Sequence, residues 1–240
     1  MLDPEVWVSQ VQGPRSLDVL GEVVDGAYPE PFRYFDLAET TIAGQPVVIS
    51  RSGFTNELGW EIYMGPDIDH AAVGDRIMAA GQSHGMIITS IEAFRARRIE
   101  AGLLNAGTDF DATTTPFQAG LGAFVDMDKD DFIGKEALSR ADRGRTVWGM
   151  RIDGGIARLG RVISRDGEPV GRVTSSGWSP FQECGVAIVR LDEAGPGPGT
   201  VFEVDCIDGS QHRGEVCDLP MYDEAREIPR GKLVAIPSVD

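Results

Sequence analysis

Apolar positions in the first part of the chain follow two different periods. Where apolar and polar residues alternate between Gly or Pro positions, strands are predicted. Where apolar residues return every three or four positions, helices are predicted. The predicted strands are Val6–Gln12, Phe32–Ile42, Pro46–Ser52 and Trp60–Met64, and the predicted helices are Ser16–Val24, Asp67–Ala80 and Ser90–Ala101. This order of elements is typical of an α+β domain.

Two local signals support the last of these helices. Thr89 and Glu92 have the spacing of a capping box at a helix start. Gly102 follows the last helical position, where a left-handed residue commonly ends a helix.

The pattern changes after residue 140, where short alternating segments follow one another at even spacing. Such a series indicates a small antiparallel β-barrel. The predicted strands are Val147–Ile152, Arg161–Ser164, Pro169–Ser175, Gly185–Arg190, Val201–Asp205 and Glu215–Leu219. We therefore expect a first domain over residues 1–140, a barrel domain over 141–232 and a tail over 233–240. The segment from Arg226 onward is expected to be loose.

Composition and charge narrow the class of protein. The chain has 240 residues and a formal net charge of −16, which argues against binding to nucleic acid. No apolar run approaches the roughly 20 residues of a membrane span, and Met1–Glu5 lacks the features of a secretory signal. We therefore expect a cytoplasmic protein without a membrane partner. The 3 cysteines and 3 histidines are scattered, so neither a disulfide framework nor a metal site is expected.

Five segments in a fixed order carry a family likeness. They are Val11–Ser16 (VQGPRS), Ile49–Ile62 (ISRSGFTNELGWEI), Arg98–Pro116 (RIEAG, then DFD and TP), Phe132–Leu138 (FIGKEAL) and Gly171–Pro180 (GRVTSSGWSP). Together they resemble the folate-dependent aminomethyltransferase family. That family includes the T-protein of the glycine cleavage system and dimethylsulfoniopropionate demethylase.

The resemblance implies a trilobed fold with tetrahydrofolate in a central channel. This chain resembles the second part of that fold, followed by the C-terminal barrel. Family chains carry further residues before the QGP segment, among them an aspartate near the reacting folate nitrogen. We therefore expect a partner for the chain, either a separate N-terminal subunit or a second copy in a homodimer.

The implied function is tetrahydrofolate-dependent transfer of a methyl or aminomethyl group, or demethylation of a small substrate. The alternative is a non-catalytic folate-binding or scaffold subunit. A third branch of the fold, the folate-dependent iron–sulfur or tRNA-modification factors, carries a reactive cysteine near FIGKEAL. Residues 130–136 contain no cysteine, which argues against that branch.

The resemblance also names candidate ligand residues. Glu61 matches the glutamate that accepts hydrogen bonds from the pterin edge, although a solvent-facing strand residue is the alternative. Phe54 stands where the family usually has tyrosine, and its ring could pack on a flat ligand or in the core. Trp60 alternates to the opposite face from Glu61, which favours a core position over a ligand contact. Arg51 could bind a carboxylate or lie on the surface. No catalytic residue is assigned.

Three positions depart from the family pattern. Phe94 occupies the place of an arginine that helps to hold folate, and the neighbouring Arg95 could substitute for it. Arg98 matches the family's own arginine and is expected to support the structure. Ala123 and Gln118 replace a tryptophan and an acid near the TP segment, which indicates a changed substrate or lost catalysis.

Overall fold

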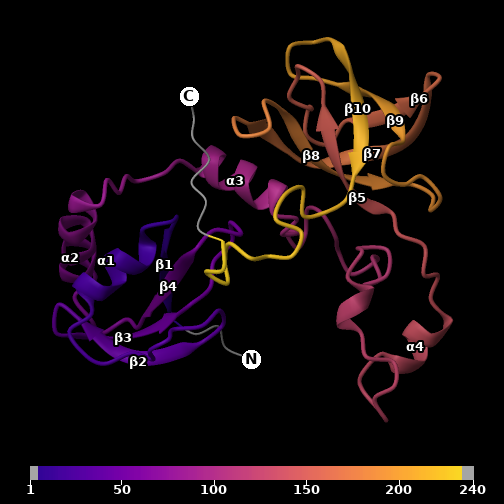
Figure 1. Cartoon of the computed structure of the whole chain (residues 1–240). Coiled ribbons are helices and arrows are strands. Elements are labelled where there is room, and N and C mark those ends of the chain that lie inside the picture. Colours follow the sequence, from indigo (N-terminus) through magenta and orange to yellow (C-terminus); the bar gives the residue numbers. More distant parts are fainter. Residues whose placement is uncertain (1–4, 234–240) are drawn as a thin grey trace. The chain divides into compact units, whose positions relative to one another are not determined.

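The computed structural model describes residues 5–233, which form two compact units (Figure 1). Residues 5–90 and 225–233 belong to the first unit, and residues 91–224 belong to the second. Each unit is described by itself below.

The first unit is built on a four-stranded antiparallel sheet with the strand order β1-β4-β3-β2. β1 and β2 are therefore its edges. The strands and helices of this unit are β1 (Trp7–Gln12), α1 (Ser16–Val23), β2 (Leu37–Ile42), β3 (Gln45–Ser50), β4 (Gly59–Met64) and α2 (His70–Ser83). The Asp69 side chain accepts a hydrogen bond from the backbone N–H of Ala72 and so caps the start of α2.

The two faces of this sheet differ because successive side chains of a strand point in opposite directions. Trp60 and Ile62 of β4 are fully buried in one core with Leu20 of α1 and Val73 of α2. α1 and α2 thus cover this face. Glu61 and Tyr63 project from the other face, beside Gln10 of β1 and Ser50 of β3 in the strand register, and within this unit no described helix covers them.

The predicted strand Phe32–Ile42 is wrong in its first half, since β2 begins only at Leu37. The preceding residues form a turn in which Phe35 has a left-handed φ of 71°. Two backbone hydrogen bonds fix this turn to the end of β3: Phe35 N–H donates to the Arg51 carbonyl at 2.8 Å, and Arg51 N–H donates to the Asp36 carbonyl at 2.9 Å. Tertiary hydrogen bonds therefore override the β propensity of the aromatic residues.

The expectation of a loose segment from Arg226 onward is also wrong for its described part. Arg51 Nη2 donates to the Pro229 carbonyl at 2.8 Å, and Arg226 Nη1 donates to Asn56 Oδ1 at 3.0 Å. Pro229 is buried. Residues 226–233 are thus fixed to the first unit, while the rest of the predicted tail lies outside the described residues.

The second unit contains a closed antiparallel barrel with the strand order β10-β5-β8-β7-β6-β9, which confirms the predicted barrel. Its strands are β5 (Val147–Ile152), β6 (Val162–Arg165), β7 (Glu168–Ser179), β8 (Cys184–Leu191), β9 (Val201–Asp205) and β10 (Gln211–Cys217). Before the barrel come α3 (Ile91–Glu100), the 3-10 turn η1 (Gly122–Phe124) and α4 (Lys135–Arg140). Gly102 is left-handed with φ 66°, as predicted for the residue that ends α3.

Two barrel strands differ from the prediction by four residues at one end, whereas β6 and β8 differ by one residue at each end. β7 continues to Ser179, and a register shift between Val173 and Ser175 lets it follow β8 over its whole length. β10 starts at Gln211 instead of Glu215, because a tight turn pairs Gln211 with Asp205 of β9. α3 packs on β7, where a Cβ on Gly177 would lie 3.5 Å from Ala96.

Candidate functional site

Gln12 of the QGP segment ties that segment to the loop between β3 and β4. Its Oε1 accepts a hydrogen bond from Thr55 Oγ1 at 2.9 Å, and its Nε2 donates to the Ser52 carbonyl at 3.2 Å. The Gln12 side chain fills the space beside two glycines. A Cβ would lie 2.1 Å from Gln12 Oε1 at Gly53, and 2.5 Å from Gln12 side-chain atoms at Gly59. The QGP segment and the loop between β3 and β4 are therefore joined by the Gln12 side chain. That loop leads into β4 and Glu61.

Glu61 is held in place on the open face of the sheet. Its Oε2 accepts a hydrogen bond from Ser52 Oγ at 2.6 Å and another from Tyr63 Oη at 3.1 Å. Its Oε1 accepts nothing from the described residues and is not enclosed. Two hydrogen bonds to Oε2 thus orient the carboxylate, and Oε1 keeps the acceptor capacity that an N–H-bearing ligand edge requires.

Tyr63 is a site residue that the sequence interpretation missed. Burial raises the pKa of its phenol, and the adjacent Glu61 carboxylate raises that pKa further. Tyr63 therefore keeps its proton at neutral pH and donates a hydrogen bond to Glu61. Its position two residues after Glu61 on the same strand could have indicated this role, since such residues share a face.

The structure gives Phe54 and Trp60 different environments. Phe54 is half-buried in the loop that Gln12 fixes. Trp60 is fully buried in the core, where its indole N–H donates to the Ser16 carbonyl at 2.8 Å. The side chain of Trp60 therefore lies on the covered face of the sheet, opposite to Glu61.

Arg51 is not a surface residue, which corrects one of the two alternatives for it. Only 3% of Arg51 is exposed, and its guanidinium donates hydrogen bonds to the carbonyls of Phe32 and Pro229. Burial lowers the pKa of the guanidinium, and the nearby Asp36 opposes that shift.

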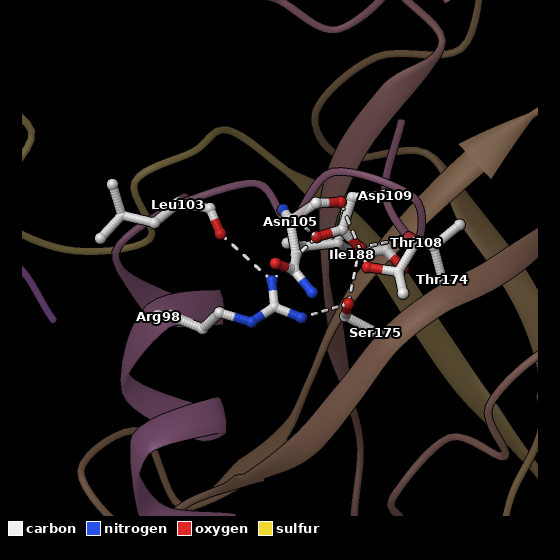
Figure 2. A network of polar contacts seen from close by, with 8 residues as sticks. All are labelled: Arg98, Leu103, Asn105, Thr108, Asp109, Thr174, Ser175 and Ile188. Carbon is white, nitrogen blue, oxygen red and sulfur yellow. Dashed lines mark hydrogen bonds and ion pairs between the residues drawn. The ribbon is translucent and has the colours of Figure 1, made fainter. Parts of the chain in front are cut away.

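The arginines of α3 in the second unit have different roles. Arg95 is exposed, and Phe94 beside it is half-buried. Arg98 is buried, and Figure 2 shows its guanidinium in a polar network with Asp109 and Ser175. Arg98 Nη1 lies 2.8 Å from Asp109 Oδ2, and Arg98 Nη2 donates to Ser175 Oγ at 2.6 Å. Arg98 thus supports the structure, as expected.

The substituted positions near the TP segment have clear structural settings. Gln118 closes a turn by accepting a hydrogen bond from the Thr115 N–H at 2.9 Å, while its own N–H donates to Thr115 Oγ1. Ala123 and the following Phe124 are exposed, and the Phe124 ring is 85% accessible. Gln118 therefore stabilises its own turn.

Two general features of the described residues concern other kinds of site. No group of three or more His, Cys, Asp or Glu side chains in residues 5–233 is placed to hold a metal ion. None of the helices in that part of the chain combines the length and the apolar character that crossing a bilayer requires.

Comparison with known proteins connects this geometry to a family. Residues 2–129 match the family model described as the GCVT N-terminal domain, and residues 145–223 match the glycine cleavage T-protein C-terminal barrel domain. A trimethylamine-oxide aldolase of Ruegeria pomeroyi is 39% identical over 92% of this chain and 30% of its own length. An aminomethyltransferase of Halothermothrix orenii is 36% identical over 88% of this chain and 59% of its own length.

A solved structure shares the architecture. The crystal structure of glycine cleavage system aminomethyltransferase T from Bartonella henselae superposes with a TM-score of 0.78 at 27% identity, over 91% of this chain and 60% of that one. The chain thus spans between about a third and three fifths of the length of these relatives. Both the matched models and the shared architecture show that the chain belongs to the glycine cleavage T-protein family.

Proposed function

We propose that this chain provides a tetrahydrofolate site for the enzymatic transfer of a one-carbon unit, either as methyl or aminomethyl transfer or as demethylation of a small substrate. Tetrahydrofolate supplies the nitrogen that carries the one-carbon unit. The protein's part is to orient the two reactants, which can lower the barrier substantially.

The observation that carries this proposal is the fixed carboxylate of Glu61. Ser52 and Tyr63 occupy Oε2, and Oε1 is left for a ligand. A carboxylate held in this way suits the N–H groups along the edge of an aminopyrimidine ring such as the pterin. The half-buried Phe54, in the loop that leads to β4, is proposed to pack against the flat ligand. Trp60 supports the site from the core beneath it.

We further propose that the site is completed by an N-terminal partner segment. The open face of the sheet carries Glu61 together with Val8 and Leu37, which are 52% and 62% exposed. A monomer rarely leaves a large apolar surface uncovered. A separate subunit or a second copy of this chain would cover this face and form the other wall of the ligand site.

The substrate class follows from the relatives by analogy. Aminomethyltransferases and a trimethylamine-oxide aldolase are both among the similar proteins. Their names point to small amine compounds as sources of the one-carbon unit. We therefore propose a small amine or methylated substrate for this chain.

Folate binding by matched variants tests the proposal. Titration calorimetry with tetrahydrofolate compares the wild type, Glu61→Gln and Glu39→Gln, alone and after mixing with the polypeptide encoded immediately upstream. Glu39 is exposed on the same sheet face, so its variant removes the same charge without touching the site. We expect tetrahydrofolate to bind more tightly in the mixture. Glu61→Gln should lose about 1.5–3 kcal/mol of binding free energy, the contribution of a hydrogen bond to a charged group.

Equal affinities for Glu61→Gln and Glu39→Gln would contradict the role of Glu61. Equal affinity with and without the upstream polypeptide would contradict the need for that partner.

A transfer assay on the same mixture separates catalysis from a purely binding role. Phe94 stands where the family has a folate-holding arginine, which favours a non-catalytic folate-binding or scaffold subunit as the second candidate. Transfer of a labelled methyl group from trimethylamine or dimethylglycine to tetrahydrofolate by the mixture would support the enzyme. Tight folate binding without any transfer would support the second candidate.

A further inference from the structure

A pocket lies in the first unit, at the end of β3 where Arg51 is buried. Its volume is about 690 Å³. Its walls come from α1, from the turn before β2, from the end of β3 and from the C-terminal segment that docks on this unit.

Three guanidinium-bearing side chains line this pocket, although the chain as a whole is strongly acidic. They are Arg33, Arg51 and Arg230, against the single carboxylate of Glu30. None of the three arginines forms an ion pair with any carboxylate in residues 5–233. Asp36 lies near Arg51, and its negative charge partly opposes the lowering of the Arg51 pKa, but the two form no ion pair. The pocket therefore has a surplus of positive charge.

Arg51 is the buried member of these three arginines. Its guanidinium is bound only to two backbone carbonyls, and its buried Nε has no hydrogen-bond partner among the described residues. A buried cation without a counter-ion is unfavourable, and buried charges in proteins are normally paired. An anion in the adjoining pocket would compensate for this charge.

Aromatic rings supply the rest of the recognition surface. Tyr34 and Phe35 lie with their ring centroids 4.1 Å apart, and Phe35 is 72% exposed despite its size. Phe35 is also held in the left-handed region at φ 71°, a backbone conformation that is strained for a bulky residue. Tyr28 and Phe32 form an edge-to-face pair in the same lining. These rings suit a flat apolar body attached to the anion.

This pocket is distinct from the site of Glu61. Leu17 and Leu20 of α1 belong to its lining, and α1 packs on the face of the sheet that carries Trp60. Glu61 projects from the opposite face. The two sites can therefore be tested separately.

We propose that this pocket binds a small aromatic carboxylate, with the carboxylate facing Arg33, Arg51 and Arg230 and the ring against Tyr34 and Phe35. The arginines provide the charge and the aromatic pair provides the stacking surface. No covalent step is involved.

The test uses a pair of ligands of the same shape that differ in charge. Fluorine NMR follows the binding of 4-fluorobenzoate and of the neutral 4-fluorobenzamide to the whole chain. We expect the benzoate to bind at least about tenfold more tightly, which corresponds to about 1.4 kcal/mol. The acidic surface as a whole would give the opposite preference, because it repels anions.

Two double variants with the same change in net charge complete the test. In Arg33→Gln/Arg230→Gln the preference for benzoate should fall at least about tenfold. In Arg158→Gln/Arg172→Gln, which alters two exposed arginines of the second unit, it should stay at the wild-type level. Thermal unfolding of each variant verifies that it is folded.

Glu61→Gln distinguishes this pocket from the folate site, because it should retain benzoate binding even where folate binding is lost. The proposal is overturned if neither ligand binds, if benzoate and benzamide bind equally, or if the two double variants behave alike.

Discussion

Arg98 and Asp109 form an ion pair across 2.8 Å in which the two side chains are 7% and 0% exposed. Asp109 also accepts hydrogen bonds from Thr174 and Ser175 of β7 at 2.8 and 2.6 Å, so it joins the end of α3 to the barrel within the second unit (Figure 2). The RIEAG, DFD and VTSSG segments of the sequence therefore meet at one buried carboxylate.

Replacing that carboxylate should destabilise the second unit. Asp109→Asn keeps the shape of the side chain but leaves the buried Arg98 without its counter-ion, which typically costs about 3–5 kcal/mol. Urea unfolding measures the change. Glu136→Gln breaks the exposed pair between Glu136 and Arg140 and should leave the free energy of unfolding close to that of the wild type. Equal effects of the two variants would contradict the structural role of Asp109.

The contact between Gln12 and Gly53 predicts a steric effect. Gly53→Ala would place a Cβ 2.1 Å from Gln12 Oε1, so the variant should lose about 1–3 kcal/mol of stability, as overpacked sites do. Gly65→Ala is the matched control, because nothing lies within 4 Å of a Cβ at that position. Combining Gly53→Ala with Gln12→Ala should recover part of the loss. If the double variant is as unstable as the sum of its single changes, the clash is not the cause.

Stability at alkaline pH should depend on Cys217. Burial raises the pKa of this thiol to about 11 from its ordinary value of 9.0. Above pH 9 the unfolded chain releases the proton while the folded chain retains it. The free energy of unfolding should therefore fall as the pH rises from about 9 to about 11, by on the order of 3 kcal/mol. Cys217→Ala should show a shallower decline over this range, whereas parallel curves for the two proteins would contradict the prediction.

The open sheet face predicts self-association of the chain on its own. Val8 and Leu37 are exposed on this face, and β1 and β2 are the edge strands of the sheet. Light scattering at increasing concentration should detect a dimer. Leu37→Lys should weaken the dimer, and Ile133→Lys, at a fully exposed position in the second unit, should not. A monomer at all concentrations would show that the face needs no partner copy.

Much of the local structure followed from the sequence. β5 and β9 have the predicted bounds, because alternation and glycine punctuation are local properties of the chain. Gly102 was predicted to end α3 for a similar reason, since few residues adopt a left-handed conformation at low cost. The ordered motifs were sufficient to predict the family, which the comparisons confirm.

The environment of several side chains was decided only by the tertiary structure. The sequence left Arg51 open between a ligand contact and the surface, and the fold buries it by bringing Pro229 to its guanidinium. The turn at Phe35 replaced a predicted strand because hydrogen bonds to Arg51, distant in sequence, outweigh local propensity. Burial, charge pairing and long-range hydrogen bonds depend on which segments meet in space, and a single sequence does not contain that information in its local pattern.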